Sequence, residues 1–243
     1  MNTVAVSGTA TVVELGKRVL DYNDRAAAVL RKRFSSAGVR VANLISSPGT
    51  GKTALVVKVC EELARSGVKA AVLVGDCATD NDARRIAQVC SMTRQIVTEG
   101  LCHLESSMID AGLEGWDLDE VDLLLIENVG NLVCPSDFDL GEDLKVALLS
   151  VTEGEDKPLK YPHLFSTAAL IVVTKMDLVE ACGMDIEAME ENIVAINPHA
   201  EVIETSARTG LGVARLASVL SNAITSKPRD GEGITIVSGR RNS

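Results

Sequence analysis

The 243-residue sequence predicts an α/β domain in which a mostly parallel β-sheet is covered by helices on both faces. Short apolar runs alternate along the chain with longer segments whose apolar residues recur at helical spacing. The apolar runs have no polar face, as expected for strands that are buried on both sides. A chain of this length can form one large domain, and nothing in the sequence indicates a second core.

The N-terminal segment, residues 1–39, is predicted to be helical over about residues 10–34 and to pack on the domain. Gly38 then breaks the chain before the first strand. The predicted strands, in chain order, are 41–45, 69–75, 94–98, 122–127, 145–151, 168–174 and 200–204. The predicted helices after the first strand are 51–66, 80–91, 103–112, 186–196 and 212–226.

The domain itself is predicted to span residues 40–226. The tail, residues 227–243, combines Pro, Gly and charged residues, and we expect it to be mobile. Residues 234–237 within it have the composition of an edge strand.

The composition argues against several classes of partner. The formal charge is −10, from 24 basic and 34 acidic residues, and aromatic residues are sparse, so neither nucleic acid nor an anionic membrane is expected to bind. No apolar stretch approaches the roughly 18 residues of a membrane span, and no signal peptide is evident. The six cysteines form no C-x-x-C pair, which fits a cytoplasmic protein whose cysteines mostly serve as small core hydrophobes.

The segment S-S-P-G-T-G-K-T, which begins at Ser46, follows the first predicted strand and begins a helix. Gly49 and Gly51 let successive backbone N–H groups point at phosphate oxygens. Lys52 adds a cation for the β- and γ-phosphates, and the Thr53 hydroxyl is placed to hold Mg²⁺. The usual pattern has Gly where this chain has Ser46, but the strand before and the helix after favour a phosphate loop over a chance helix start. The sequence therefore predicts a P-loop NTPase fold.

Two later strand ends resemble the base-reading motifs of GTP-binding proteins. In the first, T-K-x-D, the Asp177 carboxylate can accept hydrogen bonds from guanine N1–H and the 2-amino group, whereas adenine has no such donor pair. The aliphatic stem of Lys175 would cover the base, and Thr174 stands where Asn is usual. The second motif contains Ser206 and Ala207 and would direct a backbone N–H at guanine O6. Together they favour GTP over ATP and disfavour an ATP-dependent small-molecule kinase.

Two acidic residues at strand ends, Asp76 and Glu127, are candidates to serve Mg²⁺ and the hydrolytic water. Ligands of such folds gather at the carboxyl ends of the strands, where both residues lie. Most GTPases have D-x-x-G where this chain has Glu127-x-x-Gly130, so either the carboxylate holds Mg²⁺ through water or the Gly130 N–H senses the γ-phosphate. Asp80 and Asp82 follow Asp76, and Asp80 is the weaker candidate.

Three residues have the chemistry of a metal site: Cys102 and His103 at the start of a predicted helix, and Cys134 in the loop after Glu127. Thiolate and imidazole ligands suit Zn²⁺ or Ni²⁺. Three ligands are one short of a closed tetrahedral site, but two copies of the chain meeting across a two-fold axis would supply six. Adjacent Cys and His are not a specific signal, so spacing alone leaves open two core cysteines and a helix-capping His.

Taken together, these motifs resemble the hydrogenase nickel-incorporation GTPases of the HypB type, which are relatives of the urease nickel GTPase. The resemblance covers about residues 10–226. Its most specific parts are the runs E-N-V-G-N-L-V-C-P, beginning at Glu127, and S-V-T-E-G-E-D-K-P, beginning at Ser150. Members of this family also have Ser at the first place of the phosphate loop, as Ser46 is here.

The resemblance implies a role for each matched residue. Cys102, His103 and Cys134 become Ni²⁺ or Zn²⁺ ligands at the interface of a GTP-dependent homodimer. Thr53 and Asp76 become Mg²⁺ contacts, and the residues implied in hydrolysis are Lys52, Thr53, Asp76 and Glu127. The residues implied in binding GTP or GDP are Gly49, Thr50, Gly51, Lys52, Thr53, Ala54, Lys175, Asp177, Ser206 and Ala207.

The implied function is that of a cytoplasmic, GTP-hydrolysing nickel metallochaperone for maturation of [NiFe]-hydrogenase. The implied partners are a HypA-type nickel-binding protein and the hydrogenase large-subunit precursor. Several family members carry an N-terminal Cys-rich nickel site or a His-rich stretch, and this chain has neither, so we expect no separate N-terminal nickel site. Two alternatives stay open: a GTPase chaperone for another metallocofactor enzyme, of the urease or cobalamin type, and a zinc-dimerised nucleotide-binding scaffold.

Overall fold

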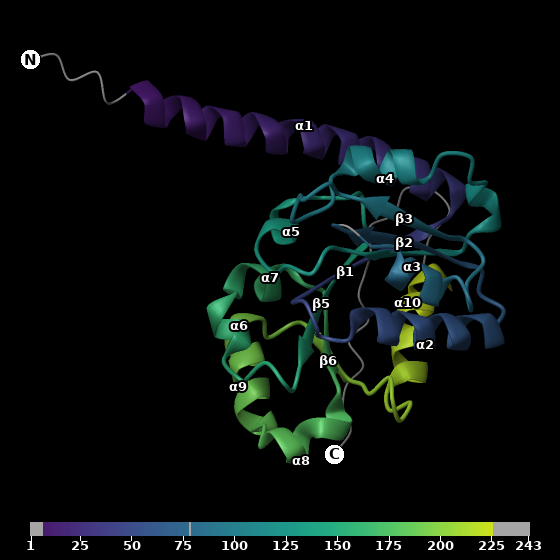
Figure 1. The fold of residues 1–243 in the computed structure, drawn as a ribbon, viewed down its shortest axis with the longest axis vertical. Coiled ribbons are helices and arrows are strands. Elements are labelled where there is room, and N and C mark those ends of the chain that lie inside the picture. Colours follow the sequence, from purple (N-terminus) through teal and green to yellow (C-terminus); the bar gives the residue numbers. More distant parts are fainter. Residues whose placement is uncertain (1–6, 78, 226–243) are drawn as a thin grey trace, which may run out of the picture.

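The computed structural model describes the backbone of residues 7–77 and 79–225 and the side chains of residues 18–77 and 79–221. Its strands form one sheet in the order β3-β2-β4-β1-β5-β6-β7, and all neighbours are parallel. The strands are β1 (Arg40–Ser46), β2 (Ala70–Asp76), β3 (Thr93–Val97), β4 (Leu123–Glu127), β5 (Leu144–Ser150), β6 (Leu170–Thr174) and β7 (Glu201–Glu204). The predicted parallel sheet with helices on both faces is confirmed (Figure 1).

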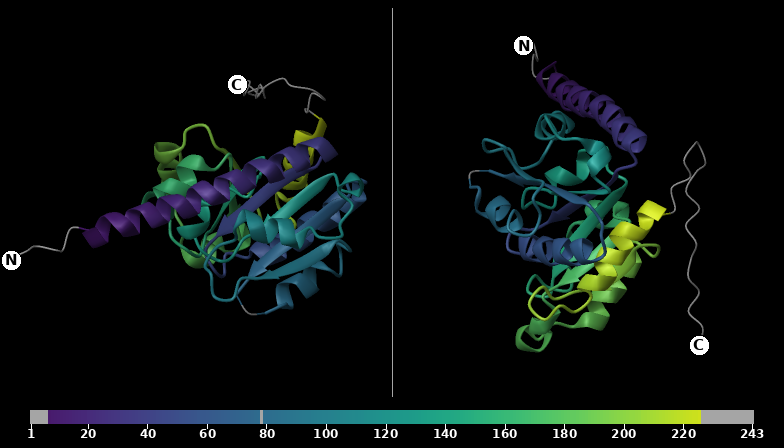
Figure 2. Two further views of the ribbon diagram at one scale, coloured as in Figure 1. Left: turned by 90° about the horizontal axis from the view of Figure 1, so that it is seen from above. Right: turned by 90° about the vertical axis from the view of Figure 1, so that its right-hand side faces the viewer.

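The helices form two layers, with α1 and α2 on opposite sides of the sheet (Figures 1 and 2). One layer contains α2 (Lys52–Arg65), α3 (Asn81–Ile86) and α10 (Val213–Thr225). The other layer contains α1 (Ser7–Ala37), α4 (Ser106–Gly112), α7 (Pro162–Thr167) and α9 (Ile186–Ile196). The shorter elements are η1 (Leu118–Glu120), α5 (Cys134–Asp137), α6 (Lys157–Lys160), η2 (Met176–Leu178) and α8 (Val179–Cys182).

The sheet separates the core into clusters because side chains alternate along each strand. On β4, Leu123 and Leu125 pack beneath α2 and α10, whereas Leu124 and Ile126 pack beneath α1 and α4. All four side chains are fully buried. Burying each one stabilises the fold by about 1.5–3 kcal/mol, which explains why these strands appear in the sequence as unbroken apolar runs.

Two predicted helices have different bounds in the structure. The helix predicted at 80–91 is too long, because α3 ends at Ile86 and the chain turns so that the buried Cys90 thiol bonds to the Ala70 carbonyl before β3 begins. The helix predicted at 103–112 begins too early, because α4 starts at Ser106. The Ser106 N–H is bonded to Asn23, on α1. His103 therefore lies in a loop and does not cap a helix.

Other local predictions also need correction. Cys134 does not lie in a loop, because it is the first residue of the short helix α5. Cys60 and Cys90 are buried as predicted, but Cys77 and Cys182 are exposed, so the assignment of most cysteines to the core is wrong for these two.

The C-terminal part of α1 is anchored by Leu30 and Phe34, which are buried against α4 and the sheet, while its N-terminal part extends beyond the body of the domain (Figure 1). The predicted domain boundaries stay a prediction. The tail 227–243 and its predicted edge strand 234–237 lie outside the described residues. Within the described ranges, no helix combines the length and the apolar character that crossing a membrane requires.

Gly212 provides a test of how β7 joins α10. Its φ is +67°, and an added Cβ would overlap the carbonyl oxygen of Glu204, whereas Gly183 has a similar φ of +60° with open space around it. We expect Gly183→Ala to lower the free energy of unfolding by about 1 kcal/mol, the cost of a left-handed backbone. Gly212→Ala should cost about 3 kcal/mol or more, because the backbone must also shift. Equal losses of unfolding free energy for the two variants, measured by urea unfolding, would contradict the close approach of Gly212 to the Glu204 carbonyl.

Candidate nucleotide and metal sites

The loop between β1 and α2 forms a cradle at the carboxyl edge of the sheet. Gly49 and Gly51 have φ of +78° and +93°, so the loop uses the backbone conformation that favours glycine. Lys52 is nearly buried, and its Nζ donates to Ser46 Oγ at 3.2 Å. Ser46, which stands where Gly is usual, therefore holds the lysine in place.

The structure brings the acidic candidates to the same place as this loop. A cleft of about 370 Å³ is lined by the loop together with Asp76, Asp82, Glu127 and Gly130. Asp80 does not line it and instead pairs with Arg84 at 2.7 Å. Asp76 ends β2 and Glu127 ends β4, and these parallel strands are neighbours in the sheet, so their carboxylates meet at one edge.

Burial governs the charges in this cleft. Glu127 is 4% exposed, and its Oε1 accepts a hydrogen bond of 2.7 Å from Thr53 Oγ1. Burial raises the pKa of Glu127, although the Lys52 ammonium and the Thr53 hydroxyl oppose the shift. Burial likewise lowers the pKa of Lys52, against the opposing carboxylates of Glu127, Asp82 and Asp76. Both groups are thus held where their charged forms lack full solvation.

The oxygen atoms of this cleft fit a magnesium ion. Glu127 Oε2 is buried and has no hydrogen-bond partner among the described residues, which leaves an acceptor to be satisfied. The Thr53 hydroxyl bonds the other oxygen of the same carboxylate, and Asp76 lines the same cleft. Carboxylate and hydroxyl oxygens are the ligands that Mg²⁺ prefers.

A second cleft, of about 440 Å³, adjoins the first and contains the predicted base-reading residues. Lys175, Asp177 and Ala207 line it together with Thr50, Gly51 and Ala54 of the phosphate loop and its helix. The Lys175 Nζ donates to the Gly49 carbonyl at 2.6 Å, so its stem crosses the loop. A larger cavity, of about 780 Å³, lies along β7 and contains none of the predicted site residues.

Asp177 is held in place by two residues of the second predicted base-reading motif, Ser206 and Arg208. Its Oδ1 accepts from Ser206 Oγ at 2.5 Å, and its Oδ2 lies 3.3 Å from Arg208 Nη1. The Ser206 hydroxyl lowers the pKa of Asp177 most, and a backbone N–H and the Arg208 guanidinium lower it further. The carboxylate is therefore charged at neutral pH, as acceptance of two guanine donors requires.

The three predicted metal ligands converge on one point. One ligand atom from each of Cys102, His103 and Cys134 lies within 4.8 Å of the others, and Cys102 Sγ is 3.8 Å from His103 Nδ1. The neighbouring Cys134 thiol raises the pKa of Cys102. Two thiols and an imidazole at this spacing suit a borderline-soft divalent ion such as Zn²⁺ or Ni²⁺.

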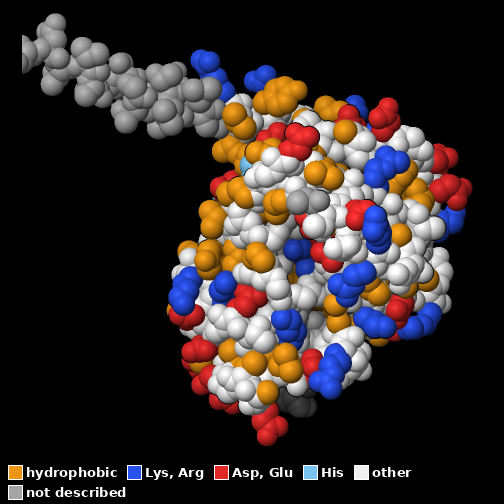
Figure 3. All heavy atoms as spheres, in the orientation of Figure 1, with side chains coloured by type: hydrophobic (Ala, Val, Ile, Leu, Met, Phe, Trp, Pro, Cys, Tyr) orange, Lys and Arg blue, Asp and Glu red, His pale blue; other side chains and the backbone are white. Residues whose placement is uncertain are grey.

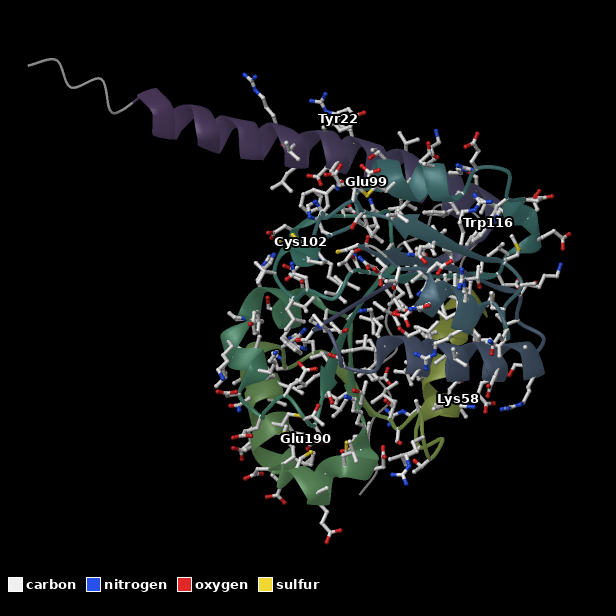
Figure 4. All side chains as sticks on the ribbon, in the orientation of Figure 1. Tyr22, Lys58, Glu99, Cys102, Trp116 and Glu190 are labelled. Atoms are coloured by element: carbon white, nitrogen blue, oxygen red, sulfur yellow. The ribbon has the colours of Figure 1, made fainter. Side chains whose placement is uncertain are left out.

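Cys102, which Figure 4 labels, lies at the surface on the side of the domain that faces α1. Together with His103 and Cys134 it forms the candidate ligand set that is called the metal cluster below. Three exposed apolar residues lie within a few positions of the ligands in the sequence. They are Val97, Leu101 and Val133, whose exposed fractions are 57%, 42% and 56%. Exposed hydrophobic side chains also gather beside α1 in the space-filling view (Figure 3). Apolar side chains around an incomplete ligand set are suited to cover by another protein surface.

Comparison with known proteins places the chain in a family. Residues 40–204 match the CobW/HypB/UreG nucleotide-binding domain. The hydrogenase maturation factor HypB of Azotobacter vinelandii is 48% identical over 202 residues, which are 83% of this chain and 66% of that protein. The chain belongs to the HypB group of this family.

Two solved HypB structures have the same fold. That from Archaeoglobus fulgidus is 38% identical with a TM-score of 0.77, and the alignment covers 84% of this chain and 99% of that one. That from Helicobacter pylori, in complex with nickel, is 33% identical with a TM-score of 0.79 and coverage of 88% and 100%. The predicted P-loop NTPase fold is thereby confirmed. The chain nevertheless spans just under two thirds of the Azotobacter relative.

The structure also places residues at these HypB-type sites that the sequence did not indicate. His103 stacks on Phe138 at 3.9 Å between ring centroids, and its Nε2 lies 3.5 Å from Glu105 Oε1. Its Nδ1 therefore faces the Cys102 thiol while Nε2 faces a carboxylate, as in many metal-binding histidines. At the nucleotide cleft, Glu153 Oε1 accepts from Thr50 Oγ1 at 2.5 Å. Glu153 lies in the S-V-T-E-G-E-D-K-P run, which was the only available signal.

The raised pKa of Glu127 predicts a pH dependence in the nucleotide-free protein. The unfolded chain releases this proton near pH 4.3, whereas the folded protein retains it until the raised pKa is passed, so the carboxyl costs stability as pH rises. We expect the unfolding free energy of the wild type, minus that of Glu127→Gln, to fall as the pH rises from about 4.3 to the raised pKa of Glu127 in the folded protein. Urea unfolding measures it, with the exposed Glu180→Gln as control. A difference that rises with pH would refute the buried carboxyl.

Proposed function

We propose that this chain is a cytoplasmic GTP-hydrolysing nickel metallochaperone that serves maturation of a [NiFe]-hydrogenase. The observation that carries the proposal is the short segment 127–134, which begins at the phosphate cleft with Glu127 and ends at the metal cluster with Cys134. Relatives named as hydrogenase maturation factors support the process, and the nickel complex of the Helicobacter relative supports the cargo.

The nucleotide cleft supplies the parts needed for hydrolysis. Backbone N–H groups of the loop and the Lys52 ammonium hold the β- and γ-phosphates, where charge accumulates in the transition state. Thr53 and Asp76 would hold Mg²⁺, which when bound would neutralise the charge that develops on the phosphate oxygens. Glu127 lies at the end of β4 and accepts a hydrogen bond from Thr53, which fixes its position. From there its carboxyl group orients the attacking water. Asp177 and Lys175 select guanine, and the products are GDP and phosphate.

The metal cluster becomes a carrier site when two copies meet. Each protomer supplies Cys102, His103 and Cys134, and the exposed apolar side chains around them are covered in the homodimer. Nickel is the cargo of this site. GTP favours the closed dimer, and hydrolysis opens it and releases the ion to the large-subunit precursor, with a HypA-type protein as a further partner.

Gating requires that the two nucleotide states bind nickel unequally. A hundredfold difference in affinity corresponds to about 2.8 kcal/mol, since each tenfold is about 1.4 kcal/mol. A few hydrogen bonds made in only one state supply this amount. An affinity that is equal in both states would leave the alternative of a zinc-dimerised scaffold.

The direct test is a Ni²⁺ titration of the protein loaded with a non-hydrolysable GTP analogue or with GDP, with mass in solution measured alongside. We expect tight binding with dimerisation in the analogue state and at least tenfold weaker binding with GDP. Cys134→Ala should lose the tight site, and Cys182→Ala, which removes an exposed thiol on α8, should not. Equal affinity in both nucleotide states would contradict the carrier mechanism.

Guanine selection is tested separately at Asp177. Asparagine in its place still accepts from Ser206, but it offers an amide N–H to the base, and so it should favour xanthine, which has a carbonyl where guanine has the 2-amino group. We expect Asp177→Asn to weaken GTP binding at least tenfold and to strengthen XTP binding. Competition binding with GTP, XTP and ATP measures this, with Glu180→Gln as control. Unchanged GTP preference would remove Asp177 from base reading.

A further inference from the structure

Asn128 follows Glu127 directly and has a side chain that is 1% exposed. Its Oδ1 accepts hydrogen bonds from the Leu104 N–H at 3.3 Å and from the Val129 N–H at 2.9 Å. Its Nδ2 donates to Asn43 Oδ1 at 3.1 Å. One side chain thus joins the end of β4, at the phosphate cleft, to the backbone of the residue that follows His103.

The orientation of the Asn128 amide is fixed by a longer buried chain of hydrogen bonds. Asn43, on β1, is fully buried, and its Nδ2 donates to Glu142 Oε1 at 3.2 Å. Glu142 Oε2 in turn accepts from the Leu140 N–H at 2.7 Å. Because Asn43 presents its oxygen to Asn128, the Asn128 oxygen must face Leu104, and the amide has no equivalent flipped arrangement.

The segment that contains Asn128 also touches the phosphate loop. An added Cβ on Gly130 would lie 3.1 Å from Pro48 Cα, so the two backbones are in close contact. Glu127 is bonded to Thr53, at the start of α2. A shift of Glu127 therefore reaches Asn128 through one peptide unit, and a shift of Pro48 reaches it from Gly130 through two.

We propose that Asn128 is a positioning residue that couples the nucleotide to the metal cluster. It transmits the position of Glu127 to the Leu104 backbone and so sets where Cys102 and His103 lie relative to Cys134. The two states of this element are the Asn128–Leu104 hydrogen bond made and the same bond broken. The inference rests on the proposed function, because it explains how the two sites of a nucleotide-gated carrier communicate.

Asn131 provides a matched control in the same segment. Its Nδ2 donates to the Cys102 carbonyl at 3.3 Å, and its Oδ1 accepts from the Val133 N–H at 2.9 Å. Like Asn128, it therefore joins the segment that leads to Cys134 to the segment that contains Cys102 and His103. Unlike Asn128, it is not next to Glu127 in the sequence. Loss of the Asn131 contacts should weaken metal binding in every nucleotide state by the same factor.

The experiment compares Ni²⁺ dissociation constants in the GDP state and in the GTP-analogue state, and takes their ratio. We expect Asn128→Ala to lower this ratio at least fivefold from the wild-type value. Asn131→Ala should raise both constants and leave the ratio within twofold. By linkage, the factor by which Ni²⁺ raises the preference for the GTP analogue over GDP must fall by the same amount in Asn128→Ala.

A second measurement needs no variant and stands even if Asn128→Ala fails to fold. Hydrogen exchange at the Leu104 amide of the wild type should be at least fivefold slower with the GTP analogue than with GDP. Equal exchange in both states, or an unchanged ratio in a folded Asn128→Ala, would overturn the role of Asn128 alone. A wild-type ratio of one would instead overturn the gating mechanism, and the present inference with it.

Discussion

The hydrogen bond between Thr53 and Glu127 is the contact on which both sites depend. It joins the first turn of α2 to the end of β4 at 2.7 Å, inside a buried cleft. Because β1 and β4 are parallel neighbours, the loops that follow them leave the sheet side by side. One is the predicted phosphate loop, and the other continues to Cys134. The segment that leads to the metal cluster is therefore anchored to the start of α2 by the Glu127 carboxylate, and it touches the phosphate loop again where Gly130 approaches Pro48.

This anchoring is costly in the absence of ligand. Lys52 and Glu127 are both nearly buried, and burial shifts both pKa values toward the neutral forms. A buried pair of this kind contributes little net stability by itself, because desolvation offsets the attraction between the charges. Phosphate oxygens would give the Lys52 ammonium a partner, and a water molecule or Mg²⁺ would give one to Glu127 Oε2, which has none among the described residues. The desolvation cost of these two groups lowers the stability of the ligand-free protein. A ligand that satisfies them therefore stabilises the folded state.

Sequence patterns predicted those features that depend on neighbouring residues. The bounds of α9 were predicted without error, because an apolar helical period begins directly after Asp185, whose side chain accepts from the Ala188 N–H. The start of α4 was missed because its first residue, Ser106, donates its N–H to Asn23 Oδ1, and Asn23 lies 83 residues away in the sequence. Phe138 beside His103 had no local signal for the same reason. The thiol and imidazole chemistry of Cys102, His103 and Cys134 made them candidate metal ligands in the sequence. Their ligand atoms come together only through long-range packing, which the sequence does not show.

A buried chain of polar side chains is unexpected in so apolar a sheet, and its position explains it. Asn43 lies on β1 between residues that pack in apolar clusters, and a Val of similar size there would avoid the cost of burying an amide. That change would leave the Asn128 amide without its acceptor, at a cost of about 1–3 kcal/mol. Apolar packing tolerates small shifts, whereas an oriented amide specifies one arrangement. In the proposed coupling between the two sites, a single well-defined arrangement of side chains matters more than the added stability of another buried apolar side chain.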